Sequence, residues 1–143
     1  MIILDTNVLS ALMQNEPQTA VVDWLDEQPG ESIWITSITL FEARYGLALL
    51  PDGKKKSRLR LAFEALIAED LDGRVLVFDR TAAEEAAQLA AERYNMGLNV
   101  DMRDTFIAGI ALARKATLAT RNIRHFNDLH VKVVNPWGSL ESR

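Results

Sequence analysis

Residues 1–7 read Met-Ile-Ile-Leu-Asp-Thr-Asn, and this short stretch decides the predicted fold. Residues 2–4 form a continuous apolar run, which is typical of a strand buried on both faces in the middle of a parallel sheet. The run ends at Asp5, and Thr6 and Asn7 follow it, so polar side chains come directly after the expected strand. In open α/β sheets, ligands bind at the carboxyl ends of the strands. We therefore expect a functional site around Asp5.

The rest of the chain alternates further strands with helices. Strands are expected at residues 33–36, 75–78, 117–120 and 131–134, and helices at residues 8–13, 19–28, 38–49, 54–71, 81–94 and 104–116. This alternation predicts a parallel sheet with helices on its faces. The helix at 104–116 is apolar almost all round, so we expect it in the interior. No repeat or flexible linker divides the sequence, and a single domain spanning residues 1–143 is expected.

The composition narrows the class of protein. Of the 143 residues, 48% are hydrophobic and 25% are charged, which is ordinary for a soluble globular domain. No apolar stretch approaches the roughly 20 residues that span a bilayer, and the N-terminus lacks the basic region of a secretory signal, so a cytoplasmic protein without membrane association is expected. The absence of cysteine excludes disulfides and Cys-ligated metals. A formal net charge of −4 argues against binding nucleic acid by whole-protein attraction, but not through a local basic patch.

Three acidic residues far apart in the chain each allow a structural and a functional interpretation. Asp5 and Asp104 stand where helices are expected to begin, and aspartate is a favoured N-cap. Glu42 lies early in the third expected helix, where a glutamate is normally solvated. It nevertheless lies beside an apolar stripe that includes Phe41 and Tyr45. Taken singly, each acid is explained by local structure.

Taken together, the three acids indicate a metal site. If the sheet brings the ends of its first two strands and the start of the buried helix side by side, then Asp5, Glu42 and Asp104 converge. Carboxylates that lie so close together raise one another's pKa and destabilise the fold unless a cation neutralises them. Ligation by oxygen alone suits the hard cations Mg²⁺ and Mn²⁺.

Several segments carry a resemblance to a known family. These segments are Leu4-Asp5-Thr6-Asn7, Phe41-Glu42, Asp104 with Ile107-Ala108, and Ala119-Thr120-Arg121-Asn122. In this order and spacing they resemble PIN domains, and among these the toxins of VapBC-type toxin–antitoxin systems, including the FitB-like branch. The resemblance extends from residue 2 to residue 137. Asp-Thr-Asn alone is a weak motif, and it is the ordered set that is specific.

The resemblance implies a fold, an activity and partners. It implies a flavodoxin-like three-layer α/β/α sandwich with a central parallel sheet. It also implies a divalent-metal endoribonuclease that is the toxin of a type II toxin–antitoxin system. Such a toxin is silenced by a cognate VapB-type antitoxin, is homodimeric, and forms a hetero-oligomer with that antitoxin. Carried over by position, Asp5, Glu42 and Asp104 are the catalytic acids that bind Mg²⁺ or Mn²⁺.

Polar neighbours of the acids are the candidates for substrate binding. By resemblance, Thr6 and Asn7 match the polar residues beside the first acid, and Thr120 matches a hydroxyl residue near the fourth acidic position. Arg121 follows Thr120 and is a candidate for RNA contact. The basic run at residues 54–60 could also contact RNA phosphates, or it could simply be a solvated helix start.

The sequence departs from the family at one position. The family often places a fourth acid within or just after the Thr-Arg-Asn segment, where this chain has Asn122 and His125. Asn122 can supply an oxygen ligand but carries no charge, and Asp101 could compensate from the other side of the site. Asp128 comes two to three residues late and is expected to cap a turn. We therefore expect one tightly held ion rather than two.

Two other functions can be considered, and only the first stays open. A catalytically weak PIN protein, acting mainly as a partner in a DNA-binding antitoxin complex, is compatible with the absent fourth acid. A phosphatase-like hydrolase would use Asp5 as a nucleophile. That chemistry needs a second aspartate two residues later, where this chain has Asn7.

Overall fold

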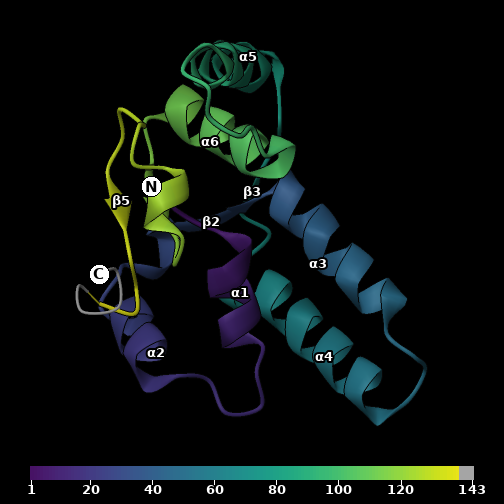
Figure 1. Ribbon diagram of the computed structural model, residues 1–143. Coiled ribbons are helices and arrows are strands. Elements are labelled where there is room, and N and C mark those ends of the chain that lie inside the picture. Colours follow the sequence, from purple (N-terminus) through teal and green to yellow (C-terminus); the bar gives the residue numbers. More distant parts are fainter. Residues whose placement is uncertain (139–143) are drawn as a thin grey trace.

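The computed structural model describes residues 1–138. Their five strands form one parallel sheet in the order β3-β2-β1-β4-β5. The strands are β1 (Ile2–Leu4), β2 (Ile33–Thr36), β3 (Val75–Leu76), β4 (Thr117–Ala119) and β5 (Val133–Val134). Strand β1 lies in the middle and pairs with β2 on one side and β4 on the other (Figure 1). The prediction that the apolar run at residues 2–4 forms a central buried strand is confirmed.

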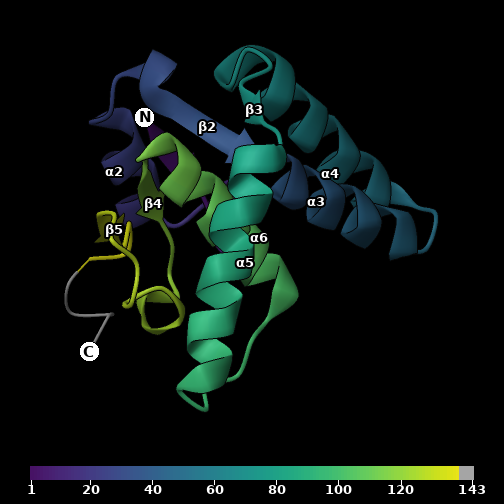
Figure 2. The same cartoon turned by 90° about the horizontal axis from the view of Figure 1, so that it is seen from above.

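Helices cover both faces of the sheet (Figures 1 and 2). The helices are α1 (Thr6–Leu12), α2 (Thr19–Asp26), α3 (Ser37–Leu49), α4 (Lys54–Ala65), α5 (Arg80–Asn95) and α6 (Met102–Arg114), and three short helical turns are η1 (Gly30–Ser32), η2 (Leu66–Asp70) and η3 (Ile123–His125). Successive strand residues point to opposite faces, so Leu4 joins a core with α1–α4 and Ile3 joins a second core with α5 and α6. The expected three-layer α/β/α sandwich is confirmed.

Helix α6 begins two residues earlier than the sequence predicts. Asp101 is its N-cap, because the Asp101 Oδ1 accepts a hydrogen bond from the Asp104 backbone N–H at 3.0 Å. The interpretation of Asp104 as the cap is therefore wrong. Asp104 lies in the first turn instead, where the partial positive charge of the helix N-terminus favours a carboxylate.

Helix α6 lies in the interior, as predicted, and packs very closely on α5. Five consecutive residues, 107–111, are buried. A Cβ added at Gly109 would lie 2.5 Å from the carbonyl oxygen of Ala82 and 2.7 Å from the Cβ of Ala86. The two helices can approach this closely only because position 109 has no side chain. None of the helices formed by residues 1–138 is both long and apolar enough to cross a membrane.

Candidate active site

The candidate site lies at the edge of the sheet where parallel strands end. Asp5 follows β1 directly, and Thr120 follows β4 directly. Strand β2 ends at Thr36, whose side chain caps α3, the helix that carries Glu42. Residues from three distant parts of the chain therefore meet at this edge, because the carboxyl ends of neighbouring parallel strands lie side by side.

Asp5 is the buried centre of the site, with 3% of its surface exposed. Its Oδ1 accepts a hydrogen bond from the Thr6 backbone N–H at 2.8 Å, as the N-cap of α1. Its Oδ2 accepts from the Thr120 hydroxyl at 2.7 Å and from the Asn7 Nδ2 at 3.2 Å. Burial raises the pKa of Asp5 to about 6, and the charges of Asp104 and Glu42 add to the rise, while the hydrogen bonds from Thr120 and Thr6 oppose it. Asp5 is thus both a helix cap and an acid that burial and two neighbouring acids destabilise in its charged form.

Glu42 is joined to this centre through Thr6. The Thr6 hydroxyl donates to the Glu42 Oε1 at 2.9 Å and also lies 3.1 Å from the Thr39 hydroxyl oxygen. The other carboxylate oxygen of Glu42 lies 3.5 Å from the Arg103 Nη1. Only 18% of the Glu42 side chain is exposed, so it is not an ordinary solvated glutamate.

The stripe beside Glu42 differs from the sequence interpretation. Phe41 and Tyr45 are 60% and 54% exposed, and their rings stack on each other at a centroid distance of 5.8 Å. Spacing alone could not show this, because a face of a helix that is apolar in sequence is buried only where another element covers it. The sequence places Glu42 beside this stripe, but its polar contacts are with Thr6 and with Arg103 of α6.

Asp104 approaches the centre from the start of α6. Its Oδ2 lies 3.0 Å from the Nδ1 of His125, and its charge is close enough to raise the pKa of Asp5. Among residues 1–138, no hydrogen bond joins Asp104 to Asp5 or Glu42 side chains directly. The structure therefore brings Asp5, Thr6, Asn7, Thr120 and Glu42 into one hydrogen-bonded group, with Asp104 as an electrostatic neighbour.

Three further candidates take different places. The Asp101 carboxylate serves as the α6 cap, and Asp101 is exposed. Asn122 is exposed and reaches the site through its backbone N–H, which donates to the Thr120 hydroxyl at 3.0 Å. Arg121 donates its backbone N–H to the Asn7 Oδ1 at 3.1 Å, and its guanidinium carbon lies 4.9 Å from the centre of the Trp137 ring.

The interpretation of Asp128 as a turn cap is wrong. Both of its carboxylate oxygens accept from the guanidinium of Arg93 at 2.8 Å, and the same guanidinium donates to the His125 carbonyl at 2.8 Å. The hydrogen bond from Arg93 lowers the pKa of Asp128. This pair fastens the end of α5 to the turn that carries His125. A local sequence pattern cannot predict this ion pair, because its two partners are 35 residues apart in the chain.

Comparisons with known proteins show the family to which the chain belongs. The PIN domain family matches residues 2–131. The chain is 38% identical over 137 residues to the VapC ribonuclease Y4jK of Sinorhizobium fredii, covering 96% of this chain and 98% of that protein. It is 39% identical over 137 residues to Toxin FitB of Neisseria gonorrhoeae, covering 96% of this chain and 99% of that protein. This chain belongs to the PIN-domain family. Among solved structures, FitAB bound to an IR36 DNA fragment matches this PIN domain with a TM-score of 0.88 and 38% identity, covering 97% of each chain.

The donors at the site of this PIN domain suit a hard cation in chemistry and charge. The side chains offer carboxylate, hydroxyl and amide oxygens, and the raised pKa of Asp5 marks a buried negative charge that lacks a close positive partner. Their present geometry is looser. Within residues 1–138, no three His, Cys, Asp or Glu side chains are gathered so that they could hold a metal ion. Glu42 and Asp104 pair with Arg103 and His125 instead, so a shared ion would compete with those two contacts.

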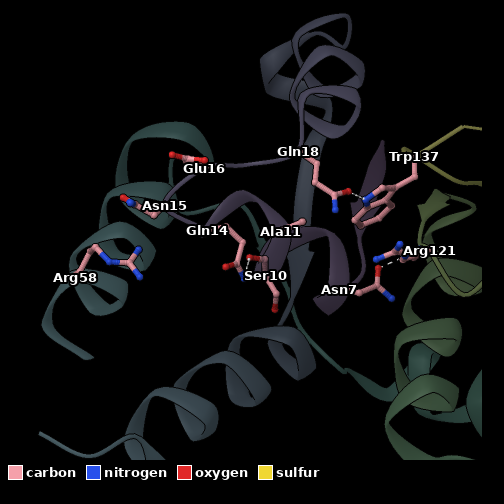
Figure 3. Close-up of a pocket in the computed structure, with 10 residues that line it drawn as sticks. All are labelled: Asn7, Ser10, Ala11, Gln14, Asn15, Glu16, Gln18, Arg58, Arg121 and Trp137. Atoms are coloured by element: carbon pink, nitrogen blue, oxygen red, sulfur yellow. Dashed lines mark hydrogen bonds between the residues drawn. The ribbon is translucent and has the colours of Figure 1, made fainter. Parts of the chain in front are cut away.

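A polar groove runs from the site along α1 (Figure 3). We call it the α1 groove; its volume is about 770 Å³, and its lining residues are Asn7, Ser10, Ala11, Gln14, Asn15, Glu16, Gln18, Arg58, Arg121 and Trp137. Asn7 belongs both to the groove and to the hydrogen-bonded group around Asp5. The sequence did not predict this groove, because it combines residues of α1 and the segment after it, of α4, of the segment after β4 and of the last described segment of the chain.

Proposed function

We propose that this PIN domain is a metal-dependent endoribonuclease and the toxin of a type II toxin–antitoxin pair. The observation that carries the proposal is the buried carboxylate of Asp5, bordered by Glu42 and Asp104 at the carboxyl edge of the sheet. Relatives with the names VapC ribonuclease and Toxin FitB, aligned over nearly their whole length, support the same activity.

Asp5, Glu42 and Asp104 are the residues that would hold Mg²⁺ or Mn²⁺. Such an ion, when bound, lowers the pKa of water and stabilises the charge that develops on a phosphate undergoing hydrolysis. The chain's own contribution is positioning. The hydroxyl of Thr120 and the amide of Asn7 fix one oxygen of Asp5, while Thr6 orients Glu42 toward the same edge. Glu42 would serve either as a ligand of the ion or as the acceptor of the proton of the attacking water.

We further propose that a cognate antitoxin binds this PIN domain and blocks the site, and that the toxin is a homodimer. Support comes from the relative solved as FitAB on a DNA fragment, which matches this chain over 97% of its length. A basic antitoxin side chain that enters the acidic site would neutralise the charge that destabilises ionised Asp5, for the same electrostatic reason that a metal ion would.

The test is cleavage of RNA by the purified chain. With a 5′-labelled RNA, the wild type is expected to cut in Mg²⁺ or Mn²⁺, to stop cutting in EDTA, and to leave 5′-phosphate and 3′-hydroxyl ends. Asp104→Asn removes a charge at the site with little change in shape, so we expect cleavage to fall by at least about 100-fold, the size of a lost electrostatic contribution in a dry site. Asp23→Asn, the same substitution on the exposed surface of α2, is the matched control and should cut like the wild type. Equal cleavage by Asp104→Asn and Asp23→Asn would refute the assignment.

A second candidate function is a catalytically weak PIN protein that acts mainly within a DNA-binding antitoxin complex. It is favoured by the absent fourth acid, since Asn122 and His125 occupy the positions where the family often has a carboxylate. The same assay separates the two functions, because this alternative expects no metal-dependent cleavage by the wild type.

A further inference from the structure

The α1 groove carries an inference that rests on the proposed ribonuclease function and extends it. Half of its lining side chains are neutral and polar, among them the amides of Asn7, Gln14 and Asn15. Three are charged, namely Glu16, Arg58 and Arg121. Arg58 of α4 lies at one end, while Arg121 and Trp137 lie at the other (Figure 3). Of the ten lining residues only Ala11 and Trp137 are apolar, so most of the side chains that could recognise a ligand here are polar.

We propose that the α1 groove binds the part of a single-stranded RNA that leaves the candidate active site. Each kind of lining side chain matches one part of a nucleotide. Amides of asparagine and glutamine carry both a donor and an acceptor, which is what the edges of bases require. Guanidinium groups bind phosphate. The Trp137 ring, over which the Arg121 guanidinium lies and which packs against the core, closes the other end of the groove.

The groove is joined to the site by one side chain. Asn7 donates from its Nδ2 to the Asp5 Oδ2 at 3.2 Å and accepts at its Oδ1 from the Arg121 backbone N–H at 3.1 Å. A strand whose phosphate lies at Asp5 therefore meets Asn7 first and then the side chains along α1. This continuity favours a polymer that extends beyond the reacting phosphate over a separate small ligand.

Arg58 gives the sharpest contact to test. Among residues 1–138, no hydrogen bond or ion pair engages its guanidinium, and it faces the groove from α4 (Figure 3). Arg60 lies two residues further along the same exposed helix and does not line the groove. Arg58→Gln and Arg60→Gln change the net charge equally, so they separate a groove contact from general attraction.

The experiment measures the binding of a fluorescein-labelled 10-nucleotide RNA of random sequence by anisotropy, in EDTA so that no cleavage occurs. Loss of one charge-assisted contact should weaken binding by Arg58→Gln about tenfold. The slope of log K against log salt should also become shallower by about 0.7, the value of one phosphate contact on a single strand. Arg60→Gln should stay within about twofold of the wild type and keep its slope. Gln14→Leu should weaken binding about threefold by removing one base-edge hydrogen bond, whereas Gln88→Leu on the exposed face of α5 should not.

Equal effects of Arg58→Gln and Arg60→Gln, or no binding of the RNA by the wild type, would overturn the proposal. Unchanged RNA binding by Arg58→Gln together with weaker binding of the antitoxin would assign the groove to the protein partner instead, and would also overturn it. Failure of the nuclease proposal alone gives a different result. The wild type would then bind the RNA, with the expected dependence on Arg58, but would not cleave it in Mg²⁺ or Mn²⁺.

Discussion

The buried carboxylate of Asp5 makes a prediction about stability that is independent of RNA. Its pKa rises from 3.8 to about 6 on folding, chiefly because burial disfavours the charged form. Asp5 is 3% exposed, so solvent screening reduces this effect little. A shift of about 2 pKa units corresponds to about 3 kcal/mol of difference between the two protonation states.

The sign of the pH dependence follows from which state holds the proton. Below about pH 3.8 Asp5 is protonated in both states and contributes nothing. Between about pH 3.8 and pH 6 the folded state keeps the proton and the unfolded state releases it, so the free energy of unfolding falls as pH rises. Above about pH 6 the deficit is complete and stays at about 3 kcal/mol.

The assay is urea unfolding in EDTA at a series of pH values from about 3.5 to 7.5, for the wild type and Asp5→Asn. Asparagine cannot ionise, so the free energy of unfolding of the wild type minus that of the variant should fall by about 3 kcal/mol across this range. Taking the difference removes the titration of the other acids. Asp23→Asn is the control, and its difference from the wild type should be flat. A difference between wild type and Asp5→Asn that does not change with pH would refute the reasoning. Added Mn²⁺ should stabilise the wild type above pH 6 more than it stabilises Asp5→Asn, because only the wild type keeps the buried charge.

Two further predictions concern packing and the buried ion pair. Gly109→Ala should destabilise the protein by about 1–3 kcal/mol in the same urea titration, because the new methyl group would collide with the Ala82 carbonyl. Gly46→Ala is the control. It has open space around it in α3 and should be neutral or slightly stabilising. Asp128→Asn should lower the free energy of unfolding by about 2–4 kcal/mol, because it leaves the guanidinium of Arg93, whose side chain is 6% exposed, without its carboxylate. Glu84→Gln is the control. It removes the exposed pair with Arg80 and should lower the free energy of unfolding by less than about 0.5 kcal/mol. Losses of equal size within either pair of variants would contradict the explanation given for it.

The elements that the sequence predicts well are those set by local pattern. The continuous apolar run before Asp5 favours a strand that is buried on both faces of the sheet, and this run forms the central strand. Helix α5 follows from its alanine content, since alanine has the highest intrinsic helix propensity. The sequence does not fix the start of α6, because two aspartates three residues apart, Asp101 and Asp104, both suit an N-cap position. Only the backbone geometry shows that the first of them accepts the hydrogen bond.

The site could be predicted in part, for a physical reason. Residues that follow parallel strands meet at one edge, so the gathering of Asp5 and Thr120 follows from topology. The side chains that contact the acids from outside do not follow from it. Arg103 and His125 reach the acids from the surface of α6 and from η3, and both depend on where those elements settle. Arg103 directly precedes Asp104, and that adjacency to a candidate acid was the one available signal.

The exposure of these two neighbours bears on how the site can exchange one cation for another. Arg103 and His125 are 58% and 57% exposed. An ion pair with so exposed a side chain, such as that of Arg103 with Glu42, contributes only about 0–1 kcal/mol. The destabilisation of ionised Asp5 amounts to about 3 kcal/mol, and neither neighbour contacts Asp5 in the described residues. A divalent ion, or a basic side chain of a partner, that reaches Asp5 would therefore relieve a destabilisation larger than the contacts that it displaces, those of Arg103 with Glu42 and of His125 with Asp104. The weak outer contacts and the destabilised charge of the inner carboxylate together favour a site that binds a cation from outside the chain.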